Sequence, residues 1–398
     1  MFVNYWFIIF AGIFFPIFWL CKIPKIRKMW LLLACVIFHY RFAGAAGVIP
    51  IIFLGVVTYF AGISNNKTFR TLTIILCVSE LIFYKYSIFF ISQVIGYINA
   101  DFAQTMLSVA KDKLLPTAPP LAISFFVFEF VHYLVDLQRG KQPIRSVGDF
   151  TLFSIFWPSV VSGPIKRFEQ FLPSIVKGCE NVNAMDIQIG LMRITMGLVK
   201  KLIIADNLNG YISYYQPNFA TLPYELRWLI FIAISLRILF DFSGYSDMAI
   251  GFARLMGIRL PENFNWPYLA SSLQDFWRRW HISLSSWIRD YIYIPLGGNQ
   301  CGMMRKISNG IIAFGICGLW HGAAWNFIFW GIYHGIGLVV STNIKSFFER
   351  FWIINKMSLL FLPFTWFATL TFVSVGWLYF FYPVSVATSM IYSLIYRY

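Results

Sequence analysis

The sequence predicts an all-α, polytopic membrane protein with about 11 transmembrane helices. Three observations support this. Of the 398 residues, 59% are hydrophobic and only 12% are charged, whereas about 25% are charged in an average soluble domain. Long apolar runs recur along the whole chain. They exclude an intrinsically disordered protein, and a soluble globular protein could not bury this much apolar surface in its core. The 32 basic residues outnumber the 17 acidic ones and lie between the apolar runs, as in cytoplasmic loops and not as in nucleic-acid readers.

Eleven apolar stretches approach the roughly 20 residues that a helix needs to cross a bilayer. The first has no basic leading region and no small-residue cleavage site, so we expect a first span and not a signal peptide. A shorter stretch at 384–396 is a candidate for one more. The eleven stretches are 2–21, 29–44, 48–63, 71–93, 121–137, 150–165, 187–206, 225–243, 307–327, 328–344 and 358–381.

Basic loops give the expected topology. Residues 22–28, 64–70 and 138–145 are rich in Lys and Arg. Two spans separate each of these loops from the next, so all three lie on the same side of the membrane if each listed span crosses once. Positively charged loops stay in the cytoplasm, so the N-terminus should be extracytoplasmic. Lys166 and Arg167 follow only one further stretch, 150–165, which is interrupted by Pro158 and Ser162-Gly163-Pro164. We therefore expect this stretch to be re-entrant.

The segment from about 254 to 306 differs in character, because arginines alternate with tryptophans and tyrosines. It is too polar for a plain span, and amphipathic helices at the membrane interface fit it better. No Asp, Glu, Lys or Arg then occurs between Lys306 and Lys345, a run too long for a single span.

Two of the five histidines follow tryptophan directly. His321 lies in the charge-free run, where an ionisable residue is a functional candidate because burying it is costly. Histidine titrates near neutrality, which suits a general base. Gly315, Gly318 and Gly322 stand at helical spacing beside it and should permit close helix approach. The alternative is a neutral histidine that is hydrogen-bonded between helices.

His281 lies in the basic, aromatic segment, with Arg278 and Ser285 about one helical turn away. An ordinary interfacial polar residue is the simpler interpretation on spacing alone. His334 is expected to be structural.

Arg237 and Asp241 stand four residues apart on an apolar helix and should form a buried ion pair. A cation site at Asp241 and Asp247 is less favoured, because the further acids that a metal needs are missing nearby. The six scattered cysteines predict neither disulfides nor a metal site.

Five ordered motifs resemble the membrane-bound O-acyltransferase family, in particular its bacterial polysaccharide branch. That branch includes the membrane subunits of alginate O-acetylation and of teichoic-acid D-alanylation. The motifs are ISFFVFEFVHYLVDLQRG at 123–140, SGPIKRFEQF at 162–171, FDFSGYSDMAIG at 240–251, LQDFWRRWHISLSSWIRDYIYIPLGGN at 273–299 and GLWHGAAWNFIFWGIYHG at 318–335.

The resemblance implies one membrane-embedded domain over 1–398, with N-terminal spans to 145, a catalytic core at 146–345 and C-terminal spans from 346. It implies interfacial and re-entrant helices around a central funnel, in the cytoplasmic membrane of a bacterium. His321 matches the catalytic histidine of the family and His281 its second hallmark histidine. No bound cofactor or metal is implied. The co-substrate would be a thioester, either acetyl-CoA or an acyl-carrier protein.

The implied activity is transfer of an acyl group, expected to be acetyl, across the membrane to a hydroxyl of a cell-surface polysaccharide or to a secreted acyltransferase-like partner. D-alanyl transfer to teichoic acid is the alternative. A transporter or flippase, or a scaffold for a soluble acyltransferase, remains open from the residues alone. The chain departs from the family after its last tryptophan, where WLYFFYPVSVATSM stands at 377–390, which puts contacts to partner proteins in doubt.

Overall fold

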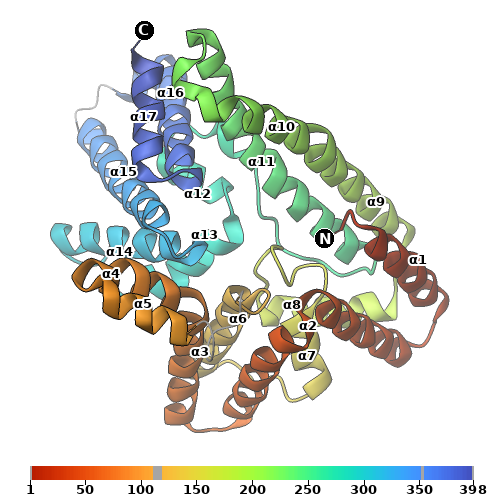
Figure 1. Ribbon diagram of the computed structural model, residues 1–398. Coiled ribbons are helices and arrows are strands. Elements are labelled where there is room, and N and C mark those ends of the chain that lie inside the picture. Colours follow the sequence, from red (N-terminus) through yellow and green to blue (C-terminus); the bar gives the residue numbers. More distant parts are fainter. Residues whose placement is uncertain (1, 111–118, 351–353, 397–398) are drawn as a thin grey trace. The chain divides into compact units, whose positions relative to one another are not determined.

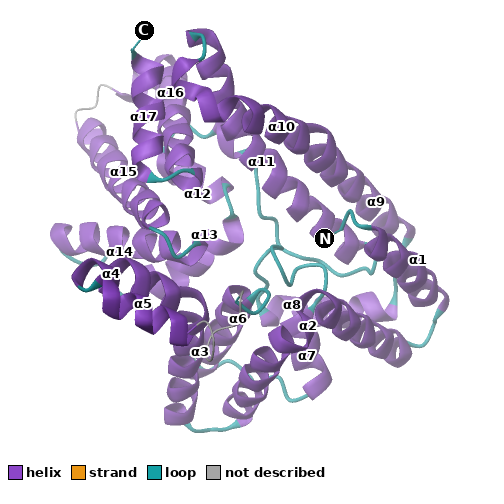
Figure 2. Ribbon diagram, viewed as in Figure 1, coloured by secondary structure: helices purple, strands orange, loops and turns teal. Residues whose placement is uncertain are grey.

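The computed structural model describes residues 2–110, 119–350 and 354–396, and throughout these residues the regular secondary structure is helical (Figures 1 and 2). Three helical stretches are long and apolar enough to cross a membrane within this part of the chain: 24–63, 67–98 and 361–381. The all-α prediction is confirmed. The number of spans, their direction and the single domain over 1–398 stay predictions.

The chain divides into two compact units. Unit 1 comprises residues 1–196 and 246–261, and unit 2 comprises 197–245 and 262–398. Unit 1 contains α1 (Tyr5–Leu20), α2 (Pro24–Ile63), α3 (Lys67–Phe89), η1 (Phe90–Ile95), α4 (Gly96–Ile98), α5 (Ala100–Val109), α6 (Ile123–Gln138), α7 (Val147–Ile155), α8 (Phe168–Glu180) and most of α9 (Ala184–Leu198).

Two expected spans, 29–44 and 48–63, lie in α2. The helix is interrupted at Gly44, whose φ of 66° and ψ of 171° are not helical. Glycine accepts this conformation because it has no Cβ. A kink thus lies between the two predicted apolar stretches, but no loop intervenes, and whether they are two spans stays a prediction. Helices α5 and α8 were not predicted, since neither is a long apolar run.

The core of unit 1 surrounds Trp157, which is fully buried. The rings of Phe7 and Phe10 on α1, Phe38 on α2 and Phe252 lie with centroids 5.5–5.7 Å from its ring. Trp157 belongs to the non-helical stretch 156–167 after α7. The predicted break in 150–165 is thus present, although α7 already ends at Ile155, and whether the segment re-enters stays a prediction.

Unit 2 contains η3 (Val199–Ala205), α10 (Asp206–Tyr215), η4 (Gln216–Thr221) and the first part of α11 (Tyr224–Arg254). After 262 follow η5 (Pro267–Leu269), α12 (Leu273–Arg279), α13 (Ile282–Ile288), η6 (Arg289–Tyr293), α14 (Met303–His321), α15 (Trp325–Arg350), α16 (Ile354–Phe381) and α17 (Val384–Ile395). The helices at 267–293 are short, as expected for a segment that is too polar for a plain span. Their place at a membrane interface stays a prediction.

The predicted ion pair between Arg237 and Asp241 is wrong. The guanidinium of Arg237 lies over the ring of Phe381, 4.5 Å from its centroid. The carboxylate of Asp241 instead lies 2.7 Å from Lys201 Nζ on η3. Each side chain finds a tertiary partner on another element, and these contacts replace the local pair along α11. Asp247 pairs with Arg193 in unit 1.

Candidate active site

His321 is the last residue of α14, although the predicted stretch 307–327 continued beyond it. The chain leaves the helix at Gly322, with extended backbone, and α15 begins at Trp325. A Cβ on Gly318 would overlap the carbonyl oxygen of Phe327, and one on Gly322 would overlap the Phe327 ring. The close approach predicted from the glycines is confirmed at these two positions. A Cβ on Gly315 would meet no atom within 4 Å.

Aromatic rings enclose the imidazole of His321. The ring centroids of Trp320, Trp330 and Phe380 lie 4.8, 5.2 and 5.0 Å from its own. Phe327 stacks at 6.4 Å. His321 is nevertheless only partly buried, so a bound molecule can reach it. Four aromatic rings thus border the imidazole, and part of its surface stays accessible.

His281 directly precedes α13 in a left-handed conformation, with φ 43° and ψ 54°, and is 1% exposed. Its Nδ1 lies 3.1 Å from Oδ1 of Asn263. The same oxygen accepts from the backbone N–H of Ser283 at 3.3 Å and from its hydroxyl at 2.9 Å. A backbone N–H can only donate, so this Asn263 atom must be the amide oxygen, and Nδ1 of His281 must carry the proton.

The neutral imidazole of His281 therefore holds its lone pair on Nε2. This atom has no hydrogen-bond partner among the residues that the structure describes. His281 lies outside the predicted spans, and burial lowers its pKa to about 3, because a charged ring would lose its hydration. At neutral pH the residue is an acceptor held in one tautomer and a weak base.

The structure brings both predicted histidines to one side chain. The Trp320 ring lies 6.1 Å from that of His281 and 4.8 Å from that of His321. Phe242, from the motif at 240–251, meets His281 edge-on at 4.7 Å. Three of the five motifs thus converge in unit 2. Sequence reasoning missed Asn263, because no spacing signal connects it with a residue 18 positions away.

His334 lies elsewhere in the same aromatic cluster and is fully buried. Its ring centroid is 4.9 Å from that of Trp330 and 5.2 Å from that of Trp277. Neither ring nitrogen has a hydrogen-bond partner in the described part of the chain. Among the described residues, no three His, Cys, Asp or Glu side chains gather in a way that could hold a metal ion.

The family of the chain follows from its similarity to known proteins. Residues 137–385 match the profile of the membrane-bound O-acyltransferase family, and the chain belongs to this family. It is an acyltransferase, as the resemblance implied.

The relatives carry more particular names. The sequence is 33% identical to a peptidoglycan O-acetyltransferase of Helicobacter pylori, in an alignment that covers 90% of this chain and 72% of the relative. It is also 33% identical to a probable alginate O-acetylase of Azotobacter vinelandii, over 95% of this chain and 74% of the relative. A teichoic acid D-alanyltransferase of Streptococcus thermophilus is 32% identical over 56% of each chain.

Proposed function

We propose that this chain transfers an acetyl group from a cytoplasmic thioester donor to a hydroxyl of an extracytoplasmic polysaccharide, or to a partner acyltransferase that completes the transfer. The two relatives aligned over most of the chain are named as acetyl-transfer proteins of peptidoglycan and alginate. D-alanyl transfer is the second candidate, favoured by the more partial match to the teichoic acid enzyme. The cytoplasmic side of the thioester donor rests on the family resemblance.

One observation supports the choice of the base: His321 is reachable, whereas His281 and His334 are almost fully enclosed. In the proposed step His321 takes the proton of the acceptor hydroxyl as its oxygen attacks the thioester carbonyl carbon. The tetrahedral intermediate then collapses, the C–S bond breaks, and the proton on His321 passes to the leaving thiolate. The products are an ester and a free thiol.

His281 takes a positioning role in this proposal. A base with a pKa of about 3 has little driving force to remove a hydroxyl proton. Its Nε2, however, presents a fixed lone pair, because Asn263 holds the proton on Nδ1. This acceptor would orient a donor group of the substrate or of His321. Orientation of the two substrates supplies the part of the rate that a general base does not.

The test replaces the proposed base. His321→Ala should lower acyl transfer at least ~10²-fold, the usual contribution of a positioned general base. The measurement is the amount of acetyl ester that mild alkali releases from envelope polymer, in cells with matched amounts of folded variant. His281→Ala should lower the rate less. Release of D-alanine in place of acetate would select the second candidate.

His334→Ala is the matched control, because it removes a histidine from the same cluster that is fully enclosed. Its rate per folded molecule should stay near that of the parent. Parental transfer by His321→Ala would refute the proposed base and favour a scaffold that docks a separate acyltransferase.

A further inference from the structure

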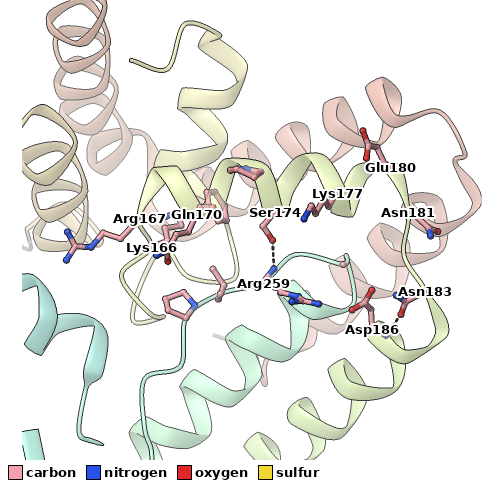
Figure 3. Close-up of a pocket in the computed structure, with 15 residues that line it drawn as sticks. Lys166, Arg167, Gln170, Ser174, Lys177, Glu180, Asn181, Asn183, Asp186 and Arg259 are labelled. Atoms are coloured by element: carbon pink, nitrogen blue, oxygen red, sulfur yellow. Dashed lines mark hydrogen bonds between the residues drawn. The ribbon is translucent and has the colours of Figure 1, made fainter. Parts of the chain in front are cut away.

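Unit 1 contains a polar pocket of about 600 Å³, and its lining includes none of the histidines described above. Its walls are the residues just before α8, α8 itself, the link from α8 to α9, the first turn of α9, and the segment 257–261 (Figure 3). This volume lies within the range of small-molecule sites. All lining residues belong to unit 1.

Two glycines bring the walls together. A Cβ on Gly178 would overlap the carbonyl oxygen of Met256, and one on Gly257 would lie 3.1 Å from the Cα of Gly178. Gly257 also has a φ of +69°, which other residues rarely adopt. The close approach allows the hydroxyl of Ser174 on α8 to accept from the backbone N–H of Arg259 at 2.6 Å (Figure 3). Arg259 is thereby fixed in the pocket wall that faces α8.

The charges of the pocket do not cancel. The Nζ of buried Lys166 lies 2.5 Å from Glu129 Oε1, and Asp186 pairs with Arg254 at 3.0 Å. These pairs neutralise one lining cation and one lining carboxylate.

Two lining cations remain without an ion pair among the described residues, the exposed Lys177 and Arg259. Arg167 adds a third positive charge to the lining, and Glu180 is its remaining carboxylate. The pocket thus carries a net positive charge, and the side-chain amides of Gln170 and Asn181 add hydrogen-bond donors.

We propose that this pocket binds a phosphate group through Lys177 and Arg259. A guanidinium presents paired N–H donors to phosphate oxygens, and an ammonium adds a mobile charge. The phosphate could come from two sources, the nucleotide end of a soluble thioester co-substrate or the headgroup of an anionic phospholipid. The proposal concerns binding by unit 1 and holds whether or not His321 is the catalytic base.

The experiment uses the full chain in phosphatidylcholine nanodiscs at low salt. Coenzyme A is titrated by calorimetry, and bound phosphatidylglycerol is measured by native mass spectrometry after exchange. Lys177→Ala combined with Arg259→Ala should weaken binding of the bound probe roughly tenfold or more, because charge-assisted hydrogen bonds are lost. Glu180→Gln should strengthen it severalfold. Coenzyme A binding identifies the soluble source, and retention of phosphatidylglycerol alone identifies the lipid.

The matched control is Lys22→Ala combined with Lys25→Ala, which removes two exposed positive charges from unit 1 outside the pocket. Its affinity should equal that of the parent. Equal weakening in control and pocket variants would overturn the proposal, since net charge alone would explain it. Parental affinity in the pocket variant, or no binding of either probe by the parent, would also overturn it. Melting temperatures in the same nanodiscs verify that the variants are folded.

Discussion

Two titratable side chains, His321 in unit 2 and Lys166 in unit 1, differ in their neighbours. Aromatic rings lie around His321. Lys166 is more deeply buried and pairs with the carboxylate of Glu129. The rings of Phe153 and Phe171 complete the enclosure of Lys166, at 5.3 and 5.4 Å from Nζ. An enclosed ammonium needs a counter-ion, because its desolvation is expensive. The rings around His321 instead leave its imidazole partly accessible.

The ion pair of unit 1 offers the largest expected effect. Lys166→Met should lower the free energy of unfolding by ~3–5 kcal/mol, because it leaves the carboxylate of Glu129 buried without its partner. Lys166→Met combined with Glu129→Leu should recover most of this loss. Reversible unfolding in mixed micelles measures both variants. Equal losses in the single and double variants would show that the pair is not the reason for the burial of Lys166.

The helix junction beside His321 offers the next effect. Gly318→Ala should destabilise unit 2 by ~1–3 kcal/mol, because the new methyl group overlaps the backbone of Phe327. Gly315→Ala, one turn earlier on the same helix, should be neutral or stabilising, since open space surrounds it and alanine favours helix. Thermal unfolding in detergent compares the two. The same melting temperature for both variants would contradict the tight packing at the end of α14.

The pH dependence gives the smallest effect. His281 has a pKa of about 3 in the folded chain and about 6.5 when unfolded. The unfolded chain therefore binds the additional proton between these values, and stability falls as the pH falls below about 6.5, by at most ~1.4 kcal/mol per unit. His281→Gln should lack this contribution. Stability at pH 6.5 and 5.5 gives both slopes, and identical slopes would show that His281 is not held neutral.

Sequence reasoning predicted the helical fold, because hydropathy is a local signal, while the roles of His281 and His321 stay predictions that rest on the motifs. It failed where tertiary partners decide. Arg237 and Asp241 have the spacing of a helical pair, yet each contacts another element. The end of α14 at His321 was missed because no Asp, Glu, Lys or Arg interrupts the sequence between Lys306 and Lys345. Asn263, which fixes the tautomer of His281, comes from a segment that carries no periodic pattern.

The discontinuity of unit 1 has a consequence for the order of events during synthesis. The indole N–H of Trp19 on α1 donates to the carbonyl oxygen of Leu255 at 2.9 Å, and residues 246–261 complete the unit that begins at the N-terminus. At about 5–20 residues per second, the ribosome needs on the order of ten seconds or more to reach the partner of Trp19. During that interval the first helices lack their contacts with residues 246–261 and stay exposed to membrane chaperones and proteases. A nascent chain arrested before residue 255 should therefore be degraded faster than one arrested after 261.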